Sequence, residues 1–113
     1  FDDGEILGSY CTQQHWAVIG GKLHLLYCRP RSDNDHIFRH RAPIFIAEID
    51  PLELQVIRAT EREAIPENNA AMGNFGICQI SDSECWVTCG DGAQTGPRKG
   101  KVNKVMFARI VAP

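Results

Sequence analysis

The sequence lacks an excess of charge of either sign, and it lacks any long apolar run. Its net charge is -2 over 113 residues, so no broad cationic field exists to attract nucleic acid or an anionic membrane. No apolar segment approaches the roughly 18 residues of a membrane helix. We therefore expect neither nucleic acid nor a membrane as a partner. The composition, 43% hydrophobic and 23% charged, is that of a folded globular chain with one domain over residues 1–113.

Signals of cellular location are also missing. The chain starts at Phe1 without a methionine and without the charged and apolar regions of a secretory leader, so we expect an excised or processed piece. Its five cysteines include no Cys-x-x-Cys pair, and we predict no metal and no cofactor. The odd count suits small buried apolar residues in a reducing compartment such as the cytoplasm. One disulfide of undetermined pairing is the alternative, and the compartment is otherwise unknown.

Branched apolar side chains dominate what is present. The 11 isoleucines and 6 valines outnumber the 6 leucines, and β-branched residues fit the pleated surface of a sheet. Segments 16–19 and 22–27 flank Gly20-Gly21, a pair that tolerates the positive φ angles of a two-residue hairpin turn. These patterns predict an all-β fold that begins with a tight hairpin.

Further strands are predicted by alternation and by turn residues. They cover residues 43–49, 54–58, 75–80, 84–88 and 105–111. The segment Thr60–Glu63 has the spacing of a capping box, but Pro66 follows closely, so at most one helical turn is expected there. The chain then contains four antiparallel strands followed by three.

The two groups of strands resemble copies of one unit. They span about residues 12–60 and 73–111. Ala108 answers Ala47 at an offset of 61 (108 − 47), and Phe75 answers Trp16 at an offset of 59 (75 − 16). Antiparallel four-stranded meanders at this interval resemble two blades of a β-propeller, with a compact β-sandwich or barrel as the alternative. The aromatic residues at matching or adjacent places are expected to be buried: Trp16, Phe45, Phe75 and Phe107.

Four segments carry a family resemblance. They are Thr12–Trp16, Asn34–Phe45, Ile57–Glu61 and Gly73–Gly76. With them the chain resembles, over residues 9–110, the C-terminal part of the sialidase-like β-propeller proteins, also called BNR-repeat glycosidases. Members of that family have five or six blades, so the resemblance implies that this chain corresponds to the last two. The Asp-box of the wider superfamily is absent, and whether the chain by itself is an enzyme stays open.

An arginine-rich loop is the first candidate ligand site. Arg29, Arg31, Arg39 and Arg41 lie within thirteen positions (41 − 29 + 1), together with His36 and His40. Guanidinium groups bind carboxylates through two parallel hydrogen bonds, so the loop could hold an anionic sugar. By the resemblance, Arg39 and Arg41 would hold the carboxylate, with Arg29 and His36 beside them. Pairing of these arginines with Asp33 and Asp35 in a structural network is the alternative.

Histidines supply the candidate catalytic groups. His15 and His40 could exchange protons near neutral pH. His15 and Asn74 open the first strand of each unit, so we expect them to face one pocket, where Asn74 would bond a sugar. A His15 bonded to backbone and an Asn74 that caps a turn are the alternatives. The spacing of His36 and His40 falls in a loop without a third ligand, so no metal site is predicted.

Other groups used in glycoside hydrolysis give weaker signals. Glu61, Glu63 and Glu67 are candidate carboxylates, but the required separation cannot be read from a sequence. Tyr27, a nucleophile by analogy with sialidases, ends a strand and is expected in the core.

Two functional hypotheses follow. The first is a carbohydrate-binding or sialidase-like propeller fragment for an anionic saccharide, without a complete active site of its own. The second is a non-catalytic module that self-associates and binds a small anion or a protein. A homo-oligomer is expected in either case, formed through an exposed strand edge at Val105–Val111.

Overall fold

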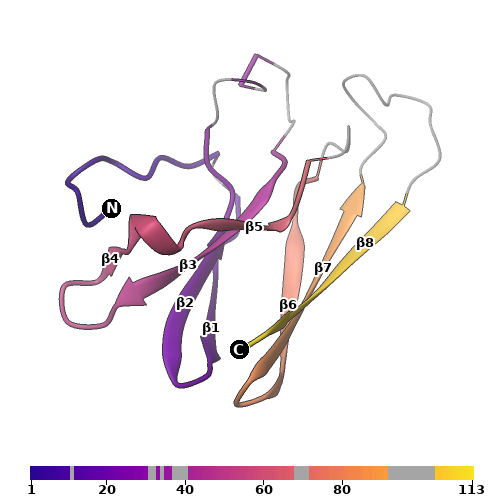
Figure 1. Ribbon diagram of the computed structural model, residues 1–113. Coiled ribbons are helices and arrows are strands. Elements are labelled where there is room, and N and C mark those ends of the chain that lie inside the picture. Colours follow the sequence, from indigo (N-terminus) through magenta and orange to yellow (C-terminus); the bar gives the residue numbers. More distant parts are fainter. Residues whose placement is uncertain (11, 31–32, 34, 37–40, 68–71, 92–103) are drawn as a thin grey trace.

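The computed structural model describes the chain except for residues 11, 31–32, 34, 37–40, 68–71 and 92–103. It is all-β and every paired strand is antiparallel, which confirms the predicted fold class. Two sheets stand against each other (Figure 1). The helix among the described residues is one short 3-10 turn, and none of the described helical structure is long and apolar enough to cross a membrane.

The first sheet contains five strands. They are β1 (His15–Ile19), β2 (Lys22–Tyr27), β3 (Ile44–Asp50), β4 (Gln55–Val56) and β5 (Arg62–Ile65). β1, β2 and β3 are neighbours in that order, and both β4 and β5 pair with the far edge of β3. The predicted hairpin is present, with φ angles of 61° at Gly20 and 75° at Gly21. Glycine adopts these positive angles without steric cost, so the turn closes in two residues.

The strand predicted over residues 54–58 is wrong in extent. β4 contains two residues because Leu54 lies in the left-handed region, with a φ of 55°. The Leu54 amide donates to the Asp50 carbonyl oxygen at 2.8 Å, and the Asp50 carboxylate accepts the Leu52 and Glu53 amides. The side chain of Asp50 therefore continues the turn that was expected to end earlier.

The helical turn expected near residues 60–63 lies earlier, and a strand replaces its second half. The 3-10 turn η1 covers Arg58–Thr60, and β5 follows it. The Thr60 hydroxyl donates to the Ile57 carbonyl at 2.7 Å and accepts the Glu48 amide of β3 at 2.8 Å. Thr60 thus joins the turn to the sheet instead of capping a helix.

The second sheet contains three strands, as predicted. They are β6 (Phe75–Ser81), β7 (Glu84–Asp91) and β8 (Lys104–Val111), in that order. Among the described residues, β8 pairs with β7 alone. Its outer edge is therefore the sheet edge that the sequence predicted.

The two sheets face each other. β1 lies against β6 and β5 lies against β8, and both hairpin turns lie at the same end (Figure 1). The Gly20 amide donates to the Asp82 carbonyl oxygen at 2.7 Å, which joins the two turns. A Cβ at Gly20 would lie 2.9 Å from the Cβ of Ala112, so this close approach also requires glycine.

Two apolar clusters hold the fold together. The first fills the space between the sheets, with fully buried Leu26, Ile44, Ile46 and Val87 among its members. The second lies on the outer face of the first sheet, where Phe1 and Leu7 cover a cluster that contains Leu25, Tyr27, Phe45, Ala47, Ile49 and Val56. The N-terminal segment is therefore a third layer that covers the first sheet.

The prediction of four buried aromatic residues is half right. Phe45 and Phe75 are 5% exposed, whereas Trp16 is 56% exposed and Phe107 is 51% exposed. Alternate strand residues face opposite sides of a sheet. In β1, Ala17 and Ile19 face the second sheet, so Trp16 faces outward.

Pairing registers give a structural alignment of the two units. Leu25 and Val87 each lie three residues after Lys22 and Glu84, the first residues after the two hairpin turns. Leu25 pairs with Ala47 and Val87 pairs with Ala108, so the two alanines occupy matching register positions. Trp16 pairs with Leu25 and Ile77 pairs with Val87. Trp16 therefore corresponds to Ile77, and its predicted match with Phe75 is two residues out of register.

Candidate functional site

The candidate site begins where β1 and β6 start, away from the hairpin turns. The His15 Nε2–H donates to the Phe75 carbonyl oxygen at 2.9 Å, and the two rings make an edge contact at 5.0 Å between centroids. Asn74 is exposed just before β6. The Arg41 guanidinium lies beside Gly73, 3.9 Å from the position that a Cβ would occupy there. The structure thus brings His15, Arg41 and Asn74 to one end of the stack.

Other predicted residues of the arginine-rich loop are only partly described. His36 is exposed, and Arg31, Arg39 and His40 lie outside the described residues. The Tyr10 hydroxyl donates to the Asp35 carboxylate. The predicted ligand and catalytic roles of these loop residues stay predictions.

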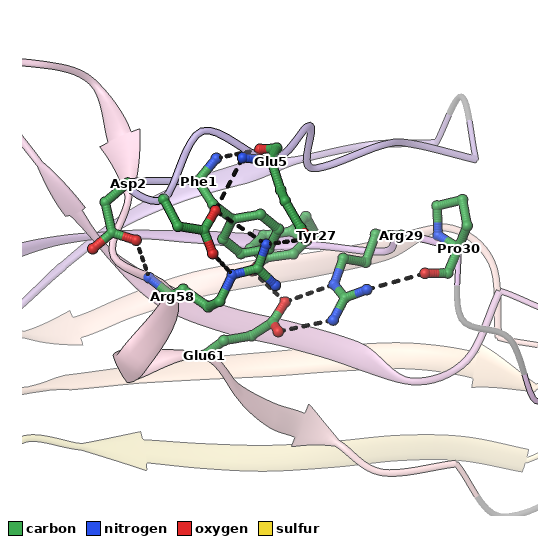
Figure 2. Close-up of polar contacts among 9 residues, drawn as sticks. Phe1, Asp2, Glu5, Tyr27, Arg29, Pro30, Arg58 and Glu61 are labelled. Carbon is green, nitrogen blue, oxygen red and sulfur yellow. Dashed lines mark hydrogen bonds and ion pairs between the residues drawn. The ribbon is translucent and has the colours of Figure 1, made fainter.

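Arg29, by contrast, has an acceptor for each of its three side-chain nitrogens (Figure 2). Its Nε and Nη2 donate to the two carboxylate oxygens of Glu61 at 2.8 and 2.9 Å, and its Nη1 donates to the Pro30 carbonyl oxygen at 3.1 Å. The Tyr27 hydroxyl donates to Glu61 Oε1 at 2.8 Å. This cluster of Tyr27, Arg29 and Glu61, called here the Glu61 network, joins the end of β2 to the segment before β5. Glu61 accepts hydrogen bonds from Nε and Nη2 of Arg29, so this edge of the guanidinium is already occupied. Ligand binding by Arg29 stays a prediction.

Aromatic rings enclose the same network. The Arg29 guanidinium carbon lies 4.8 Å from the Phe45 ring centroid and 5.7 Å from that of Phe1. The Arg58 guanidinium carbon lies 3.8 Å from the Phe1 ring centroid, and the Arg58 Nη2 donates to Glu5 at 2.6 Å. The two cation–π contacts of Phe1 and the ion pairs of Arg58 hold the N-terminal segment against the first sheet.

The electrostatics of the Glu61 network oppose catalysis by Tyr27. Burial raises the pKa of the Tyr27 phenol, and its hydrogen bond to the Glu61 carboxylate raises that pKa further. A phenol must ionise or lose its proton to a base to act as a nucleophile. Burial opposes ionisation of Glu61, but the hydrogen bonds from Arg29 and Tyr27 outweigh burial and hold the Glu61 pKa below its ordinary value. Tyr27 is 1% exposed, so its expected place in the core is confirmed.

Two cysteine thiols lie near this end of the stack. Cys28 and Cys89 are buried between the sheets, and Cys89 Sγ donates to the Asn74 carbonyl oxygen at 3.5 Å. Burial raises the pKa of Cys28 to about 12. Since the thiolate is the reactive form, this thiol is a structural one. Three of the four described cysteines are buried and Cys78 is exposed.

A cavity of about 270 Å³ lies at the opposite, hairpin end, and its lining combines apolar and charged residues. The lining residues are Ile19, Gly20, Lys22, His24, Glu48, Arg62, Val111, Ala112 and Pro113. None of the predicted site residues is among them. His24 is the buried polar residue here, and its Nδ1–H donates to the Lys22 carbonyl oxygen at 3.0 Å. Burial lowers the pKa of His24 below its ordinary value of 6.5.

We expect His24 to make stability depend on pH in the weakly acidic range. Its imidazole binds protons more weakly in the folded chain than in the unfolded chain, so stability falls as pH decreases below the ordinary pKa of 6.5. Urea unfolding across this range should show a smaller pH slope in His24→Gln than in the natural chain. Equal slopes in the natural chain and His24→Gln would contradict the assignment.

Sequence reasoning missed two parts of this arrangement. It did not pair Arg29 with Glu61, and it did not connect Arg58 with the acidic residues Asp3 and Glu5. No short-range spacing signals these pairs, since 32 positions separate Arg29 from Glu61 and 53 separate Glu5 from Arg58. Within the part of the chain that the structure describes, no three histidine, cysteine or acidic side chains gather in a way that could hold a metal ion.

Comparison with known proteins assigns no family to this chain. No family model matches the sequence, and no curated protein and no solved structure matches the chain. The resemblance to sialidase-like propellers therefore rests on the quoted segments and stays a prediction.

Proposed function

We propose that this chain is a non-catalytic binding module for an anionic saccharide, with a propeller-like pair of sheets as its scaffold. The saccharide binds at the end of the stack where β1 and β6 start. The observation that carries the proposal is the meeting of His15, Arg41 and Asn74 at this end, although 26 residues separate His15 from Arg41 (41 − 15) and 33 separate Arg41 from Asn74 (74 − 41).

The scaffold supports this location. The chain runs outward across β1, β2, β3 and β5, and then returns to place β6 beside β1. Consecutive propeller blades are connected in this way, and ligands of propellers gather near the inner strands. A guanidinium binds a sugar carboxylate through two hydrogen bonds, and an exposed amide such as that of Asn74 both donates to and accepts from hydroxyl groups.

Binding is favoured over hydrolysis by the state of the candidate catalytic groups. Tyr27 is buried with a raised pKa, and Glu61 is held by Arg29 and Tyr27. Retaining glycosidases need two carboxyl groups across the scissile bond, or a substitute nucleophile that the sugar can reach. The Nε2–H of His15 is directed to a backbone carbonyl. These contacts support the reading of His15 as a structural histidine beside a binding surface.

The proposal is tested by titration with sialic acid, the carboxylated sugar that the resemblance implies, and with its uncharged methyl ester. We expect the natural chain to bind the acid and to bind the ester more weakly. Arg41→Ala should weaken binding of the acid by roughly 10- to 100-fold, because one charge-assisted contact contributes about 1.5–3 kcal/mol.

Arg109→Ala is the matched control. Arg109 lies on the second sheet and pairs with Glu84, so its replacement should leave saccharide affinity unchanged. Equal affinity for acid and ester, or an unchanged affinity in Arg41→Ala, would contradict the anion site. Turnover of an aryl sialoside by the purified chain would contradict the non-catalytic assignment.

A further inference from the structure

The outer face of the second sheet is apolar and exposed. Its β8 residues Val105, Phe107 and Val111 are 79%, 51% and 50% exposed, and Trp86 of β7 is 39% exposed. Trp86 and Phe107 make an edge contact at 5.2 Å between ring centroids. Cys78 of β6 pairs with Trp86 and shares this face. These five residues define what we call the open face.

The open face is equivalent to a face that is buried elsewhere in the molecule. Lys22 and Glu84 each follow a two-residue hairpin turn and lie 62 positions apart (84 − 22). At the same offset, Leu26 corresponds to Thr88. Leu26 pairs with Ile46 and Thr88 pairs with Phe107, so Phe107 takes the place of Ile46. Ile46 is fully buried between the sheets.

An ion pair repeats on the two equivalent faces with its charges exchanged. In the first sheet Lys22 contacts Glu48 at 2.9 Å, and in the second Glu84 contacts Arg109 at 2.7 Å. The Arg109 Nε and Nη2 donate to both oxygens of Glu84, and Trp86 also donates to Glu84. The pair on the second sheet is neutral as a whole, so two such faces can meet without repulsion between like charges.

The far side of the stack, which is the outer face of the first sheet, limits how a second copy can dock. On the outer face of the first sheet, Phe1 and Leu7 cover the cluster on β2, β3 and β4, whereas Trp16 and Val18 of β1 are exposed. Asp2 holds that cover in place, because its amide donates to the Val56 carbonyl at 2.9 Å and its carboxylate accepts the Arg58 amide at 3.0 Å. Head-to-tail stacking would have to displace this segment. The described residues leave Val105, Phe107 and Val111 of the open face exposed, so a second open face can contact them.

We propose that two copies of this chain associate through their open faces into a symmetric dimer. Trp86 and Phe107 lie at the centre of the contact, where aromatic residues typically contribute most of the binding energy. An interface that uses the same surface twice closes at two copies, and two sheets pack readily face to face. In the dimer the four sheets lie in one stack, and an N-terminal segment packs on the outer sheet at each side.

Sedimentation equilibrium at micromolar concentration tests the dimer. We expect the natural chain to have the mass of a dimer, and we expect Phe107→Glu to weaken association by at least about 10-fold, because a carboxylate would be buried without a partner. Val18→Glu is the matched control: Val18 is also 51% exposed but lies on the outer face of the first sheet. It should leave the dimer unchanged.

Several outcomes would overturn the proposal. A monomeric natural chain excludes the dimer, and loss of association in Val18→Glu indicates head-to-tail contact. A dimer that persists unchanged in folded Phe107→Glu indicates pairing at the edge of β8. Alkylation of Cys78, located by peptide mass, gives a readout on the natural chain alone. The proposal expects Cys78 to react on dilution and to be protected on concentration, and equal reactivity at both would contradict it.

Discussion

Phe45→Ala is expected to lower the free energy of unfolding by about 3–5 kcal/mol, as large-to-small substitutions of buried aromatic residues do. Phe45 is 5% exposed and stacks on Tyr27 at 5.9 Å between ring centroids. It also lies beneath the Arg29 guanidinium. The alanine variant would therefore lose apolar burial, an aromatic contact and a cation–π contact together. Urea unfolding at neutral pH measures the change.

Phe107→Ala is the matched control for Phe45→Ala. It removes the same side chain from a position that is 51% exposed. The expected loss in the monomer is about 1 kcal/mol, chiefly from the edge contact with Trp86. Both variants should be compared at concentrations at which the chain is monomeric. Similar losses in the two variants would mean that the second apolar cluster contributes little to stability.

Glu61→Ala is expected to lower the free energy of unfolding by about 3 kcal/mol. The side chains of Arg29 and Glu61 are 23% and 13% exposed, so removal of the carboxylate leaves a largely buried guanidinium without its bidentate partner. The Tyr27 hydroxyl loses its acceptor in the same step. Glu53→Ala, at an exposed glutamate on the turn before β4, should change stability by less than about 0.5 kcal/mol.

The effect of Glu61→Ala on the free energy of unfolding should depend on pH in the acidic range. Because the folded chain lowers the pKa of Glu61 below its ordinary 4.5, the stability from this carboxylate is present above that value and is lost as pH falls through the lower folded value. The difference in unfolding free energy between the natural chain and Glu61→Ala should therefore shrink in that acidic window. A difference that stays constant with pH would show that Glu61 contributes by packing and not by charge.

Local sequence patterns were sufficient for most of the strands. Gly20-Gly21 determined the first hairpin because few other residues accept positive φ at both turn positions. Alternation and β-branched residues located the strands of the second sheet. The same local reasoning failed at residues 54–63, where Asp50 and Thr60 form side-chain bonds to backbone atoms that depend on how the turn meets β3.

Which face of a strand is buried was decided by the tertiary structure. An aromatic residue in an alternating strand fits either side of a sheet, and only the second sheet and the N-terminal segment determine which side is covered. Phe45 and Trp16 both lie on the outer face of the first sheet, but Phe1 and Leu7 cover Phe45 and leave Trp16 exposed. Phe107 is exposed on the outer face of the second sheet. The register error between Trp16 and Phe75 has the same origin, since only strand pairing defines equivalent positions.

The candidate site divides in the same way. The sequence by itself determined the all-β class, the two units and the kinds of side chain available to hold an anion, because these depend on composition and short-range pattern. Only the tertiary structure decided that Arg29 bonds Glu61 and that Arg41 lies near Gly73. An arginine several bonds long can reach partners far apart in sequence, and the partner it takes depends on which segments the packed sheets bring beside it.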